Sequence, residues 1–74
     1  MKMIKIAKKG FNVEIYIDRD YNVDININNK NVTYCDGETI RNNAETDGVT
    51  PQEWIDAFVI DPLEKVETLE QVLD

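Results

Sequence analysis

The sequence predicts one α+β domain over residues 1–74, in which a four-stranded antiparallel β-meander is followed by two or three short helices packed on one face. Residues 1–35 alternate apolar and polar side chains, which is typical of half-buried strands. Residues 36–74 change to helical spacing and contain helix-start signals. With 74 residues, 42% of them hydrophobic and 31% charged, the chain is expected to fold around one thin core.

The four strands are expected to pair in the order 1-2-3-4. Lys9-Gly10 and Asn29-Lys30 are typical of two-residue hairpin loops, and residues 18–20 suit a three-residue loop. With loops at these positions, every pairing keeps apolar residues on one face of the sheet. The expected partners are Ile4 with Ile15, Ile6 with Val13, Ile15 with Val23, Val13 with Ile25, Ile27 with Val32 and Ile25 with Tyr34.

The same register has two consequences for the polar face of the sheet. It places Glu14 directly opposite Asp24, with Lys5 on the other side of Glu14, and it puts Cys35 on this face. Two adjacent carboxylates raise the pKa of one of them or hold a cation. We expect either a solvated pair bridged by Lys5 or an acidic spot that faces a partner.

Two or three helices are expected in the second half, where residues 36–49 are either helix or loop. Residues 39–47 form a short helix with Ile40 and Ala44 inward, and Gly48 ends it in the left-handed conformation. Residues 50–53 read Thr-Pro-Gln-Glu, a capping box with Pro at the first helical position, and Asp-Pro-Leu-Glu at 61–64 repeats this signal. The expected buried residues are Trp54, Ile55, Phe58 and Val59, followed by the stripe Leu63, Val66, Leu69 and Leu73.

The composition excludes several kinds of chemistry. The chain has no His, no Ser and a single Cys, which excludes Ser/His and Cys/His nucleophiles and Cys/His zinc sites. The spacing Asp20-x-Asn22-x-Asp24 opens like a calcium loop, but Ile25 stands where such a loop needs Gly. We therefore expect a non-enzymatic protein with no metal and no cofactor. The lone Cys, with no apolar run of signal-peptide or membrane length, favours the cytoplasm.

The charge is divided unevenly between the two halves. The net charge is −7, and it arises as +2 from residues 1–35 and −9 from residues 36–74. Such a surface repels nucleic acid and attracts a basic protein. The expected partner is therefore a protein with a basic surface, bound by a monomer or weak dimer without membrane attachment.

The candidate partner-binding residues are all acidic. In the last helix, carboxylates recur at three- to four-residue spacing beside the apolar stripe, and carboxylates near a helix C-terminus oppose the macrodipole. Such a ridge either binds a partner or keeps the surface soluble. The candidates are Glu14, Asp24, Glu53, Asp56, Glu64, Glu67, Glu70 and Asp74.

Two alternative functions remain open. Ala44, Gly48 and Val49 follow the spacing of a bacterial helix-turn-helix unit, which favours a small transcriptional regulator. The recognition helix would begin near Thr50, yet no Lys or Arg follows until Lys65, and base and phosphate contacts need such residues. The other alternative is a structural accessory protein of a phage or its host.

In size, acidity and lack of catalytic residues, the chain resembles small phage-encoded inhibitors such as anti-CRISPR and antirestriction proteins. Those proteins often use carboxylates to occupy nucleic-acid-binding clefts, and no sequence motif of theirs occurs here. Residues with AT-rich codons (Ile, Asn, Lys, Tyr and Phe) number 28, against ten Ala, Gly, Pro and Arg, which favours an AT-rich bacterium or its phage. The resemblance implies an inhibitor that occupies a basic site on a partner protein.

Overall fold

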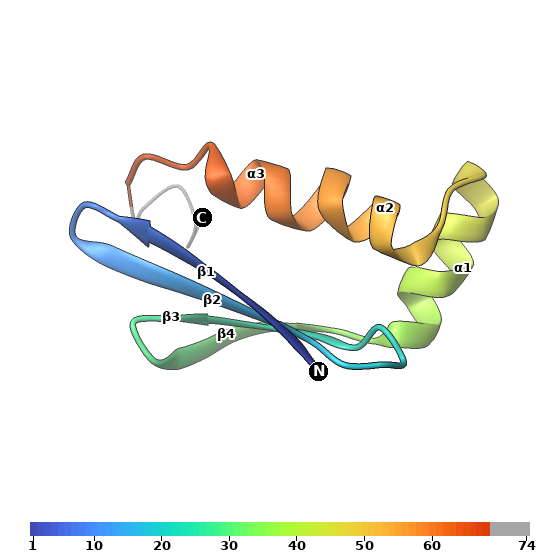
Figure 1. Cartoon of the computed structure of the whole chain (residues 1–74), viewed down its shortest axis with the longest axis horizontal. Coiled ribbons are helices and arrows are strands. Elements are labelled where there is room, and N and C mark those ends of the chain that lie inside the picture. Colours follow the sequence, from blue (N-terminus) through green and yellow to red (C-terminus); the bar gives the residue numbers. More distant parts are fainter. Residues whose placement is uncertain (69–74) are drawn as a thin grey trace.

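The computed structural model describes residues 1–68 and has two layers (Figure 1). A four-stranded antiparallel sheet forms one layer; a long helix lies along one face of it, and α1 stands at one end. No helix within the described residues is long and apolar enough to cross a membrane. The elements are β1 (Lys2–Lys8), β2 (Phe11–Ile17), β3 (Val23–Ile27), β4 (Lys30–Cys35), α1 (Gly37–Asp47), α2 (Pro51–Ile55), the π-helical turn η1 (Asp56–Ile60) and α3 (Asp61–Glu64).

The α+β class and the strand order β1-β2-β3-β4 are confirmed. The first hairpin also has the predicted register, with Ile4 opposite Ile15 and Ile6 opposite Val13. Gly10 has a φ of 90°, a conformation that residues with a side chain rarely adopt, and this explains the tight turn.

The predicted register of the second hairpin is wrong. Ile15 pairs with Ile25 rather than with Val23, because the loop extends over residues 18–22. The carboxylate of Asp18 accepts backbone hydrogen bonds from Asp20 (2.8 Å) and Asn22 (3.0 Å), which stabilises this longer loop. The error is two residues, so the apolar side chains stay on the same face.

The third hairpin differs from the prediction by a β-bulge. Its turn lies at Asn28-Asn29, both with positive φ, one residue earlier than expected. Asn26 pairs with Asn31 and Ile25 with Thr33, so Val32 is the extra residue.

Because of the bulge, the side chains at the end of β4 lie on the opposite faces of the sheet from those predicted. Tyr34 lies opposite Asp24 on the polar face, whereas Cys35 lies opposite Val23 and packs against the core. The predictions that Tyr34 pairs with Ile25 and that Cys35 lies on the polar face are therefore wrong.

Helix α1 is attached to the loop between β2 and β3. The Gly37 N–H donates to Asn22 Oδ1 (2.6 Å), and a guanidinium nitrogen of Arg41 donates to the carbonyl of Asp20. A Cβ atom at Gly37 would lie 2.1 Å from that carbonyl oxygen, so only glycine allows this approach. Gly48, with a φ of 72°, ends the helix as predicted.

The capping box at residues 50–53 is confirmed, but the second helix-start signal is not a start. Residues 51–64 run as one helix, and Asp61 has helical dihedral angles. Pro62 has no N–H, and its ring would clash with the carbonyl four residues earlier in a regular α-helix. The π turn η1 directly precedes it, with the Asp61 N–H bonded to the carbonyl of Asp56. The chain accommodates the proline within the helix in this way.

The core lies between the sheet and the helices. Ile15, Ile25 and Ile55 are buried as expected, and Trp54 is half-buried. Phe58 is 58% exposed, so the prediction that it is buried is wrong. Leu63 and Val66 pack on the edge of the core, although Val66 follows the end of the helix. Leu69 and Leu73 lie outside the described residues.

The burial pattern predicts unequal effects for one substitution at two valines. Val13 is fully buried in β2, whereas Val32 is 41% exposed at the bulge of β4. Val13→Ala should lower the free energy of unfolding by about 2–3 kcal/mol through lost transfer energy and a cavity. Val32→Ala should change it by less than about 0.5 kcal/mol. Urea unfolding followed by circular dichroism measures both, and equal losses would contradict the register.

Candidate protein-binding surface

Two aromatic side chains on the flank of the long helix form the most unusual feature of the surface. Trp54 and Phe58 are one turn apart, and their ring centroids lie 5.1 Å from each other with the planes tilted by 38°. Ile55 and Val59 occupy the side of the helix that faces the sheet, so the neighbouring positions fall on the flank. We call Trp54 and Phe58 the aromatic pair.

The indole ring of Trp54 is held by a hydrogen bond from another helix. Its Nε1–H donates to Asp47 Oδ2 (3.2 Å), and Asp47 is the last residue of α1. The turn at Gly48 and the cap at Thr50 fix the position of one helix relative to the other. The aromatic pair is therefore presented by a defined helix–turn–helix corner.

One carboxylate contacts the aromatic pair, and another lies on the same long helix. Asp47 accepts the hydrogen bond of the Trp54 ring, and Asp61 follows the π turn η1 that contains Phe58. The side chain of Asp61 is exposed and has no hydrogen-bond or ion-pair partner within residues 1–68. The surface thus combines the exposed ring of Phe58 and the half-buried ring of Trp54 with an unpaired carboxylate on the same helix.

Glu53 and Asp56, two of the predicted partner-binding residues, are exposed on α2 and η1 and also stabilise the helix locally. Glu53 accepts the backbone N–H of Thr50 (3.1 Å), and this hydrogen bond holds the pKa of its carboxyl below the usual value. Asp56 accepts a hydrogen bond from the Gln52 side chain (3.0 Å). Both carboxylates add negative charge to the helical layer.

The predicted acidic ridge on the last helix is not formed as expected, because the helix ends at Glu64. Glu64 is exposed, and its backbone carbonyl accepts a hydrogen bond from the Lys8 ammonium group of β1. Glu67 lies beyond the helix, so the two residues do not share a helix face. Glu70 and Asp74 lie outside the described residues.

The open face of the sheet separates the two carboxylates that were expected to pair. Glu14 lies opposite Asn26, and Asp24 lies opposite Tyr16. Asp24 accepts a hydrogen bond from the Asn31 side chain (3.3 Å). The predicted Glu14–Asp24 pair is therefore wrong, because the loop before β3 is two residues longer than expected.

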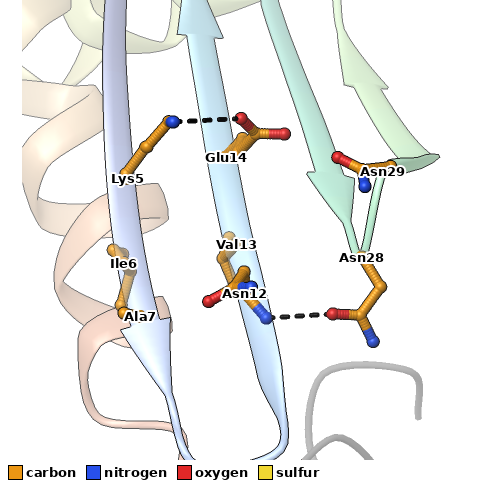
Figure 2. A pocket seen from close by; sticks show the side chains of 8 residues that line it. All are labelled: Lys5, Ile6, Ala7, Asn12, Val13, Glu14, Asn28 and Asn29. Carbon is orange, nitrogen blue, oxygen red and sulfur yellow. Dashed lines mark hydrogen bonds and ion pairs between the residues drawn. The ribbon is translucent and has the colours of Figure 1, made fainter.

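Glu14 instead lies beside a shallow depression of this face (Figure 2). It forms the predicted ion pair with Lys5, with 4.0 Å between Lys5 Nζ and Glu14 Oε2. The Asn12 N–H donates to Asn28 Oδ1 (3.0 Å) at the other end of the depression, whose volume is 380 Å³. One cation, Lys5, and one anion, Glu14, line it, so the charges of its lining side chains cancel.

The part of the chain that the structure describes contains no cluster of metal ligands. Within residues 1–68, no three Cys, Asp or Glu side chains are grouped so that they would hold a metal ion.

No family model matches the sequence, and no curated protein or solved structure matches it either.

The sequence prediction missed the aromatic pair because it assigned both rings to the core. A signal was present in the spacing, since residues 54, 55, 58, 59 and 60 are all apolar. These five positions occupy a wider arc of the helix surface than a sheet on one side can bury, so part of this apolar arc stays exposed.

The cap that positions Trp54 predicts the effect of a threonine substitution. Thr50 Oγ1 accepts the Glu53 N–H (3.1 Å), so Thr50→Ala should cost about 0.5–2 kcal/mol of unfolding free energy. Thr46→Ala is the matched control, because the Thr46 hydroxyl only bonds a carbonyl within α1 and alanine favours a helix. Thermal or urea unfolding should show a loss for Thr50→Ala alone, and an equal effect of both would contradict the capping role.

Proposed function

We propose that the chain is a non-catalytic protein-binding module, acting as a small inhibitor or adaptor that places its helical layer against a basic site of another protein. The observation that carries the proposal is the aromatic pair, in which Phe58 is exposed, on a helical layer rich in carboxylates. Aromatic side chains are enriched in the centres of protein interfaces, and tryptophan in particular often dominates binding energy. Phe58 is 58% exposed, which is unusual for a ring that sits on the helix covering the core.

The charge of the helical layer supports a basic partner. Residues 36–68 contain nine Asp or Glu and two Lys or Arg. One of these two cations, Arg41, is already engaged with the carbonyl of Asp20. A surface of this charge attracts a basic site from a distance and raises the rate of association.

Nucleic-acid-binding proteins carry basic sites of this kind, because lysine and arginine bind phosphates. A carboxylate surface that occupies such a site would compete with the nucleic acid. This is the mode of action implied by the resemblance to phage-encoded inhibitors, and it belongs to the same proposal.

The transcriptional-regulator alternative is less well supported by the helical corner. α1, the turn and α2 follow one another as in a helix-turn-helix unit. However, no Lys or Arg lies between Arg41 and Lys65, and Glu53 is committed to the cap. A DNA-reading helix needs cations for phosphates and donors for base edges.

One pair of charge reversals tests the proposal. Asp61→Lys and Asp24→Lys make the same change of residue and charge, on the helical layer and on the open sheet face respectively. A partner captured from a bacterial lysate would be purified and titrated with each variant at two salt concentrations. Asp61→Lys should weaken binding at least about tenfold, or about 1.4 kcal/mol, and reduce the salt dependence. Asp24→Lys should change it by less than about threefold.

Two results would contradict this function. Equal effects of the two reversals would show that only net charge matters. A shift of a DNA oligonucleotide by the wild-type chain at low salt would favour the regulator instead.

A further inference from the structure

We propose that the open face of the sheet binds an arginine side chain of an extended basic peptide, with the guanidinium stacked on Tyr34 and hydrogen-bonded to Asp24. This site lies on the face of the sheet that the long helix does not cover, so its ligand is distinct from the basic partner of the helical layer. Binding at this site is therefore independent of the proposed function.

The strand register places a tyrosine on each side of one carboxylate. Asp24 of β3 lies directly opposite Tyr16 of β2 on one side and Tyr34 of β4 on the other, and Met3 of β1 continues this row beyond Tyr16. Side chains that lie directly opposite each other on one face of a sheet have Cβ atoms about 4.5–5.5 Å apart. One ligand group can therefore contact the Tyr34 ring and the Asp24 carboxylate together.

The β-bulge at Val32 brings Tyr34 into this row. Without the extra residue, the pairing that starts at Asn26 and Asn31 would continue regularly and place Tyr34 opposite Val23, on the core face. Bulges are common beside functional sites, where they turn a side chain toward the other face of the strand. Here the bulge places an aromatic side chain that is 56% exposed beside Asp24, where its ring is open to a ligand.

The surroundings of the Tyr34 ring are negatively charged. Desolvation raises the pKa of the Tyr34 hydroxyl, and three nearby carboxylates raise it further. These carboxylates belong to Asp36, Asp24 and Asp18. A cationic group that binds beside Tyr34 is therefore attracted by several charges at once.

The Asp24 carboxylate has an oxygen atom to offer to a cation. Its Oδ1 accepts a hydrogen bond from the Asn31 side chain at 3.3 Å, which leaves Oδ2 without a partner within residues 1–68. The cation that β1 places on this face, Lys5, forms its ion pair with Glu14 in the neighbouring row. Asp24 therefore remains available for a cation from another molecule.

A guanidinium group fits this combination of a ring and a carboxylate. It is planar, has five donors in a fixed fork and stacks on aromatic faces while it hydrogen-bonds a carboxylate. Arginine is found over aromatic rings more often than lysine, whose ammonium group is a point charge. The apolar stem of the arginine can cover Tyr16 and Met3, which continue the row across the sheet.

Other ligands satisfy only part of the site. An anion is repelled by the carboxylates around Tyr34. A quaternary ammonium group can cover the ring but has no hydrogen-bond donor for Asp24. A second copy of the chain brings a net charge of −7 against an equal charge. An arginine on a basic peptide satisfies the ring, the carboxylate and the charge together.

Two peptides of equal charge and length test the site. They are acetyl-(Gly-Arg)4-amide and acetyl-(Gly-Lys)4-amide, each titrated at low salt by calorimetry and into the isotope-labelled chain by NMR. The arginine peptide should bind at least about fivefold more tightly than the lysine peptide. The amide signals that it shifts most should belong to β3 and β4.

Two matched pairs of variants separate charge from stacking. Asp24→Asn and Glu45→Gln each remove one negative charge, and Glu45 is exposed on α1. Asp24→Asn should weaken binding of the arginine peptide at least about fivefold, and Glu45→Gln less than about twofold. Tyr34→Leu should abolish the preference for arginine, whereas Tyr34→Phe keeps the ring and should retain it. Circular dichroism verifies that all four variants are folded.

Several results would overturn the arginine site. Binding of neither peptide, or equal affinity for both that Tyr34→Leu leaves unchanged, would exclude guanidinium recognition. Shifts confined to α2, η1 and α3 would show that the peptides bind only the helical layer. Self-association in analytical ultracentrifugation that Tyr34→Leu abolishes would assign the row to a second copy instead. None of these results changes the outcome of the Asp61→Lys titration with the basic partner, so the proposed function is judged separately.

Discussion

A single helix is narrower than the sheet that it covers, and this mismatch decides which apolar residues are buried. A helix is about 10–12 Å wide with its side chains, whereas four strands about 4.8 Å apart span more than that. The helix of residues 51–64 therefore buries the apolar residues of the central strands β2 and β3. On β1, Ile4 and Ile6 are only half-buried, and no residue of β4 is fully buried. Phe58 is exposed because its side of the helix faces beyond the buried part of the core.

The loop between β2 and β3 determines where this helix begins. Asp18 holds Asn22 through both the backbone and the side chain, and Asn22 in turn accepts the N–H of Gly37. The hydrogen bonds that the Asn22 side chain and backbone donate to Asp18 keep the pKa of the Asp18 carboxyl below its usual value. Because α1 is fixed to the sheet in this way, its last residue, Asp47, meets Trp54. The contacts that position the candidate surface therefore begin in the loop between β2 and β3, which is far from this surface in the sequence.

Alternation and capping signals predicted most of the fold, because both depend on short-range physics. The strand order, the first hairpin, the stop at Gly48 and the cap at Thr50 all follow from residues close in sequence. Two features depended on contacts that spacing does not encode. Side-chain hydrogen bonds of Asp18 lengthened one loop, and a bulge reversed the faces of the end of β4. The site was missed because amphipathic spacing gives the apolar face of a helix but not the width of its partner.

Phe58 contributes little to folding because its ring is exposed, which leaves the ring available to a partner. The most direct test compares Phe58→Ala with Ile55→Ala, two apolar truncations in the same helix, by urea unfolding. Ile55 is fully buried, so its loss should cost about 2–5 kcal/mol. Phe58→Ala should cost less than about 1.5 kcal/mol, the contribution of one aromatic pair. A loss of about 3–5 kcal/mol for Phe58→Ala, as for a core phenylalanine, would show that the ring belongs to the core and is not free to bind a partner.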